Sequence, residues 1–129
     1  MNYSATLLEH FRAPRNVGMM RNADAVGESE DSSCGDLARF YLRVLDGRIA
    51  EARFQTYGCG PSIAASSLAT ELVQGRPVGE LAELTPLAVE RALGGLPDER
   101  RHAASVVVAA LQAAASQYRA AHPPEASRA

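Results

Sequence analysis

The amino-acid sequence predicts an α+β domain, in which a small antiparallel sheet of about three strands packs against several helices. Two strand-like runs come early in the chain and are joined by a two-residue turn, as in an antiparallel hairpin. The segments after position 60 have the apolar spacing of helices instead. Strands followed by helices are typical of α+β folds rather than of parallel α/β folds.

The chain begins with a helical pattern. Tyr3, Leu7 and Phe11 share one face of a helix, and the sequence APRNVG at 13–18 ends it. The next segment is polar and irregular, and we expect one short strand in it, around 25–29.

The clearest local pattern predicts a β-hairpin. Apolar residues alternate with arginine and tyrosine over 38–44, which indicates a half-buried strand. Asp46-Gly47 follows, and this dipeptide suits a type I′ turn. We expect the return strand to run from about Arg48 to Tyr57, with one face formed by Ala50, Ala52, Phe54 and Thr56.

Helical patterns fill the rest of the chain. Pro61 suits the first turn of a helix that follows the hairpin. Short helical pieces are expected at 79–84 and 86–93. Pro97-Asp98-Glu99 then opens a long last helix, which Pro123-Pro124 ends.

The composition excludes several classes of protein. Charged residues make up 22% of the 129 residues and the net charge is −2, so no basic surface for nucleic acid is expected. All 13 basic residues are arginine, which excludes lysine Schiff-base chemistry. No apolar run approaches the roughly 20 residues that span a bilayer, and no signal peptide is recognisable. We therefore expect a cytoplasmic protein with a single domain over 1–122 and a flexible tail over 123–129.

The two cysteines are the main candidates for chemistry. Cys34 lies in SSCGD and Cys59 in TYGCG, and a cytoplasmic location argues against a structural disulfide between them. Both lie beside glycine at the edges of expected secondary structure, and Asp36 follows Cys34 by two residues. This setting favours metal ligands or reactive thiols, with small buried cysteines as the alternative.

Histidine is the other ligand type to consider. His10 lies on the first helix and is expected to be a surface or packing residue, and His122 lies near the tail. His102, in RRHAAS at the start of the last helix, is the best placed, although a surface or hydrogen-bonded histidine is the alternative. Ser66 and Ser67 have no His–Asp partner in register, which argues against a serine hydrolase.

Five segments in order carry a family resemblance: YSATLLEHFRAPRNVG (3–18), SCGD (33–36), EARFQTYGCG (51–60), SIAASSLATELVQG (62–75) and GGLPDERRH (94–102). Together they make the chain resemble the iron–sulfur cluster assembly scaffolds, which are the IscU proteins and especially the N-terminal domain of NifU. The resemblance covers almost the whole length.

The resemblance implies a shallow surface site in which three cysteines, a histidine and an aspartate hold a nascent [2Fe–2S] cluster, or zinc. Cys34, Asp36, Cys59 and His102 match this pattern, whereas the third cysteine is replaced by Ala103. The four matching residues could complete a tetrahedral zinc site. They could also hold a more labile [2Fe–2S] cluster, because imidazole can replace thiolate on one iron.

The resemblance further implies a scaffold or carrier rather than an enzyme. Such a protein binds iron or a cluster transiently, takes sulfur from a cysteine desulfurase, and passes the cluster to acceptor or carrier proteins. Ala103 cannot accept a persulfide, so sulfur would go to Cys34 or, in preference, Cys59. The segment LPDER (96–100) departs from the LPPVK-like sequence that a dedicated Hsp70 chaperone reads, which puts chaperone-assisted release in doubt.

Two alternatives remain open from the sequence. The first is a zinc-binding protein that docks on the desulfurase without building clusters, and Ala103 favours it. The second is a persulfide sulfur carrier that acts through Cys59.

Overall fold

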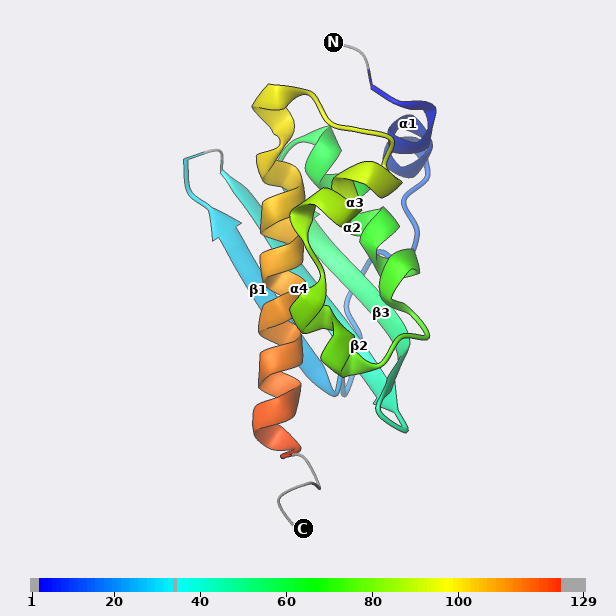
Figure 1. Cartoon of the computed structure of the whole chain (residues 1–129), viewed down its shortest axis with the longest axis vertical. Coiled ribbons are helices and arrows are strands. Elements are labelled where there is room, and N and C mark those ends of the chain that lie inside the picture. The colour runs from blue at the N-terminus through cyan, green and yellow to red at the C-terminus, as the bar shows by residue number, and fades with distance from the viewer. Residues whose placement is uncertain (1–2, 34, 124–129) are drawn as a thin grey trace.

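A computed structural model describes residues 3–33 and 35–123, and the predicted α+β fold is confirmed (Figure 1). The strands β1 (Ala25–Asp31), β2 (Asp36–Leu45) and β3 (Arg48–Tyr57) form one antiparallel sheet in the order β1-β2-β3. The helices are α1 (Ala5–Arg12), α2 (Gly60–Val73), α3 (Pro86–Ala92) and α4 (His102–Ala121), with 3₁₀ turns η1 (Val78–Glu83) and η2 (Asp98–Arg100).

The helices pack on the sheet and on one another. Figure 1 shows α4 lying across β1 and β2, while α2 packs against β3 and α4, and α1 packs against α2. Phe40 and Phe54 from the sheet and Leu111 from α4 are at most 2% exposed, and they belong to one core. No described helix is long and apolar enough to cross a membrane.

Small residues allow α4 to approach the sheet closely. A Cβ atom on Gly27 of β1 would lie 2.2 Å from both the carbonyl oxygen of Ala110 and the backbone nitrogen of Ala114. No side chain fits there, because real Cβ atoms do not approach backbone atoms so closely. Glycine at this position therefore sets the spacing between strand and helix.

The hairpin confirms the predicted turn but not the whole predicted strand face. Asp46 and Gly47 have φ values of 54° and 76°, as a type I′ turn requires. Arg43 pairs with Glu51 but Val44 pairs with Ile49, so Ala50 is the extra residue of a β-bulge.

The bulge changes which side chains of β3 face the core. Ile49 is fully buried and Ala50 is exposed, so the prediction that Ala50 lies on the same face as Ala52 and Phe54 is wrong. Ala52 and Phe54, beyond the bulge, are buried as predicted. An inserted residue shifts the two-residue alternation by one, and apolar spacing alone does not reveal the insertion.

The other elements follow the predictions with shifted bounds. The first strand extends to Asp31, two residues beyond the predicted end. Asp98 and Glu99 form the separate turn η2 instead of the first turn of α4, which begins at His102. Such 3₁₀ turns are common next to α-helix ends. The helix α4 ends at Ala121; of the predicted flexible tail over 123–129, all but Pro123 lies outside the described residues.

We predict that Gly27→Ala destabilises the protein by about 3 kcal/mol, because the added methyl must push α4 away from β1. The melting temperature should fall by roughly 10 °C in a thermal scan. Gly79→Ala is the control, since nothing lies within 4 Å of a Cβ at that position. Equal melting temperatures for the two variants would contradict the close contact.

Candidate metal centre

Three of the predicted ligands come together at one end of the molecule. Asp36, Cys59 and His102 each offer a ligand atom, and these atoms all lie within 4.8 Å of one another. The residues come from the start of β2, the segment before α2 and the first turn of α4, at the end of the molecule where α4 begins (Figure 1). Cys34, the fourth predicted ligand, lies outside the described residues.

Asp36 is at the centre of this cluster. It is the first residue of β2 and shares the core-facing side of the strand with Ala38, which leaves Asp36 only 1% exposed. Its Oδ2 lies 2.8 Å from His102 Nε2 and 3.8 Å from Cys59 Sγ. Its Oδ1 accepts a hydrogen bond from the Cys59 backbone N–H at 3.2 Å. Both carboxylate oxygens are therefore held.

The two glycines around Cys59 have different roles. Gly58 has a φ of 148°, and a Cβ there would lie 2.0 Å from Asp36 Oδ1. A Cβ on Gly60 would instead lie 3.1 Å from the ring of Phe11 on α1. Gly58 thus lets the Asp36 carboxylate reach the backbone before Cys59, and Gly60 lets α1 pack against the start of α2.

Cys59 and His102 leave the centre partly open to solvent. Cys59 is the N-cap residue of α2 and is half-buried, and the His102 side chain is 18% exposed. Ala103, the residue that departs from the family pattern, is fully buried. The candidate ligand atoms are therefore held in place while the centre stays partly accessible to solvent.

The sequence reasoning missed a fourth member of the cluster, Ser62. Its hydroxyl donates to Asp36 Oδ2 at 2.8 Å and lies 3.2 Å from Cys59 Sγ, and the residue is fully buried. The signal was available in the sequence, because residues three positions apart on a helix lie on the same side and Ser62 follows Cys59 by three.

The donor atoms fit a metal ion. Thiolate, imidazole and carboxylate are the ligands that zinc takes in proteins, and thiolate and imidazole also bind iron–sulfur clusters. Metal–ligand distances of about 2.0–2.3 Å place neighbouring ligand atoms roughly 3.3–3.8 Å apart in a tetrahedral site. The 3.8 Å between Cys59 Sγ and Asp36 Oδ2 is already at the upper end of this range. The 2.8 Å between Asp36 Oδ2 and His102 Nε2 must lengthen by less than about 1 Å.

The other two histidines do not join the centre. His122 is exposed at the end of α4, where its ring stacks on Tyr118. His10 is 4% exposed and its Nδ1 lies 2.7 Å from Ser67 Oγ. Ser67 therefore has a histidine partner that the sequence did not indicate, but the acidic contact of His10 is Glu71 rather than an aspartate, and Ser67 is fully buried.

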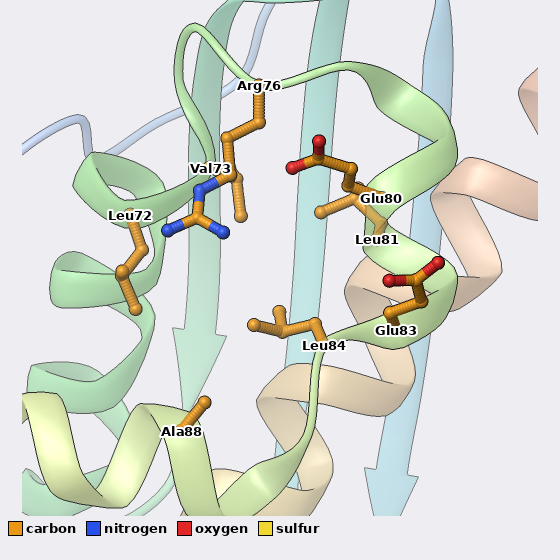
Figure 2. Close-up of a pocket in the computed structure, with 8 residues that line it drawn as sticks. All are labelled: Leu72, Val73, Arg76, Glu80, Leu81, Glu83, Leu84 and Ala88. Atoms are coloured by element: carbon orange, nitrogen blue, oxygen red, sulfur yellow. The ribbon is translucent and has the colours of Figure 1, made fainter.

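One hollow on the surface lies well apart from the centre. It has a volume of about 200 Å³ and lies at the C-terminal end of α2, roughly 20 Å from Cys59 by the length of that helix. Figure 2 shows its lining side chains: Leu72, Val73, Arg76, Glu80, Leu81, Glu83, Leu84 and Ala88. None of them is a cysteine or histidine, so the thiol chemistry belongs to the other end of the helix.

Comparisons with known proteins give a family match over almost the whole chain. The family model described as "NifU-like N terminal domain" matches residues 2–123. The iron-sulfur cluster assembly scaffold protein IscU 1 of Archaeoglobus fulgidus is 43% identical over 116 residues, which are 90% of this chain and 76% of that protein. The nitrogen fixation protein NifU of Azotobacter chroococcum is 38% identical over 120 residues, 92% of this chain and 39% of that protein.

A solved structure shares the fold. The crystal structure of the N-terminal part of a NifU-like protein from Brucella abortus matches with a TM-score of 0.74 and 18% identity, covering 91% of this chain and 94% of that one.

We predict that Gly58→Ala lowers the affinity for zinc, because a Cβ would occupy the position of Asp36 Oδ1. Gly18→Ala is the matched control: its φ of 119° gives similar backbone strain, about 1–3 kcal/mol, but its Cβ meets nothing within 4 Å. Competition with a chromophoric chelator measures the affinity of both variants. Equal affinities would contradict the role assigned to Gly58.

Protonation of His10 should make stability depend on pH. Burial and then the Arg15 guanidinium lower the pKa of His10 from its ordinary value of 6.5, and Glu71 and Glu9 offset this only in part. The unfolded chain then binds a proton more readily than the folded one, so stability is full above the unfolded pKa and is lost as pH falls through it towards the folded pKa.

The test compares the wild type with His10→Gln. We expect the wild-type free energy of unfolding to fall between pH 7.5 and pH 5.5, and the fall to be smaller in the variant. Urea unfolding at several pH values measures both. Parallel curves would show that His10 does not carry this dependence.

Proposed function

The chain belongs to the family of NifU-like N-terminal domains, and we propose that it is an iron–sulfur cluster assembly scaffold or carrier. In this role it binds iron and sulfide as a [2Fe–2S] cluster for a limited time and passes the cluster to acceptor proteins. The cluster is cargo, so the protein's task is to hold it firmly enough to assemble and weakly enough to release.

The observation that carries the proposal is the convergence of Asp36, Cys59 and His102 on one partly open centre. Cys59 supplies a thiolate and His102 an imidazole, which are both known ligands of cluster iron. Asp36 supplies a carboxylate oxygen, which binds cluster iron less well than a thiolate does. Cys34 is proposed as the second thiolate ligand, and only its match to the family motif supports this assignment.

Ala103 makes release easier in this proposal. The family pattern has a third cysteine there, and the chain offers only two thiols in 129 residues. A cluster held by fewer thiolates loses iron more readily to an acceptor or a chelator. Cys59 is the proposed sulfur-accepting thiol, since its Sγ lies in the half-open centre. It takes the outer sulfur of the persulfide on a cysteine desulfurase, whose own thiolate is the leaving group, and a dithiol reductant supplies the two electrons that release this sulfur as sulfide.

A zinc-binding role on the same residues is the second candidate. It is favoured by the donor set of sulfur, nitrogen and oxygen, which suits zinc without any sulfide. Such a protein could dock on the desulfurase without building clusters. Iron and sulfide content separates the two candidates.

Anaerobic reconstitution with ferrous iron, cysteine, a desulfurase and a dithiol reductant tests the proposal. We expect the wild type to take up iron and acid-labile sulfide in about equal amounts, as a [2Fe–2S] cluster requires. Cys59→Ser should lose most of both. Ser66→Ala is the control, since its hydroxyl contacts Thr56 and Ser62 but none of the three ligands. Zinc bound without any sulfide uptake would favour the second candidate.

We also predict that Ala103→Cys slows cluster loss. A thiolate restored at the family position should lower the rate at which a chelator removes iron by about tenfold or more. Ala104→Cys is the matched control variant, because it also adds a buried thiol to α4, one position further along. Equal rates for the two variants would mean that position 103 does not face the cluster.

A further inference from the structure

We propose that Ser62 is a positioning residue of the metal centre, which orients the Asp36 carboxylate for the bound ion or cluster. The inference rests on the proposed function in one respect, that Asp36 is a ligand. Ser62 is not one of the ligand positions that match the family pattern, and it acts on the centre through hydrogen bonds.

The geometry places the Ser62 hydroxyl between two ligands. It donates its single proton to Asp36 Oδ2 at 2.8 Å, while its oxygen lies 3.2 Å from Cys59 Sγ. The hydroxyl therefore contacts the carboxylate and the sulfur at once, on the side of the centre formed by α2. A hydroxyl in this position fixes the direction in which Oδ2 faces.

The need for this contact follows from burial. Asp36 is 1% exposed, and a buried carboxylate is costly unless its oxygens are hydrogen-bonded. Oδ1 is held by the Cys59 backbone N–H, and Oδ2 contacts Ser62 and His102. An ion that takes the His102 lone pair removes the hydrogen bond from that ring nitrogen. The Ser62 hydroxyl then remains as a side-chain partner that keeps the carboxylate in place.

Ser62 is itself fixed by the fold. It is fully buried in the first turn of α2, and its carbonyl oxygen accepts the hydroxyl of Ser66 at 2.9 Å. Ser66 Oγ also lies 2.7 Å from Thr56 Oγ1 on β3. These contacts tie the backbone at the start of α2 to the sheet, whereas the Ser62 hydroxyl itself is held by its own contacts with Asp36 and Cys59.

The effect is expected on affinity more than on stability. Outer partners of metal ligands typically change metal affinity by about 10–100-fold. We expect Ser62→Ala to weaken the binding of zinc and of cobalt(II) by about tenfold or more. Ser66→Ala removes a hydroxyl that is equally buried and also hydrogen-bonded, but that contacts no ligand, and it should leave both affinities within about twofold.

A double-mutant cycle distinguishes positioning from general destabilisation. If Ser62 acts through Asp36, then Ser62→Ala should cost much less affinity in an Asp36→Ala background than in the wild type. Ser62→Thr keeps the hydroxyl and adds a methyl group to a packed site, so it should be less stable than the wild type and yet bind zinc within about threefold. This variant keeps the test valid if Ser62→Ala does not fold.

Anaerobic chelator competition with zinc and cobalt(II) on the full chain gives the outcomes. Weaker binding by Ser62→Ala alone, with coupling to Asp36, is the expected result. Wild-type affinity in Ser62→Ala, or an equal loss in Ser66→Ala, would overturn the role of Ser62 and leave the proposed function standing. Failure of the wild type to bind either metal would overturn the proposed centre and this inference together.

Discussion

The contacts of the buried Asp36 carboxylate are the constraint on which the candidate centre depends. They join three elements that are far apart in the sequence: β2 through Asp36 itself, the start of α2 through Cys59 and Ser62, and the start of α4 through His102. The cost of burying a carboxylate is offset only while these partners stay in place. The same contacts that assemble the ligands therefore help to fix where the two helices begin.

Several features of the fold serve this arrangement. Gly58 leaves room for Asp36, Gly60 admits the ring of Phe11, and Gly27 lets the middle of α4 lie close to the sheet. Glycine has no side chain, so none of these residues can itself bind a metal through one. Their effect is to remove steric bulk where backbone and carboxylate approach closely.

Local features were predictable from the sequence, and tertiary ones were predictable only through the family resemblance. The hairpin was predicted because alternation and an Asp-Gly turn are properties of neighbouring residues. The bulge at Ala50 was not, since it depends on how β3 pairs with β2. The contact between His10 and Ser67 joins residues 57 positions apart, and no spacing rule indicates it. Spacing did contain a signal for Ser62, three residues after Cys59, although its partner Asp36 is known only from the fold.

The central claim is that one cluster is held by ligands from separate elements, among them His102. Pulsed electron paramagnetic resonance of the reduced, reconstituted protein, with its histidines labelled with ¹⁵N, tests this most directly. The account predicts a strong ¹⁵N coupling that disappears in His102→Ala and persists in His122→Gln. His122 is the control because it lies exposed at the far end of α4. A reconstituted cluster without ¹⁵N coupling, or with coupling that survives in His102→Ala, would contradict it.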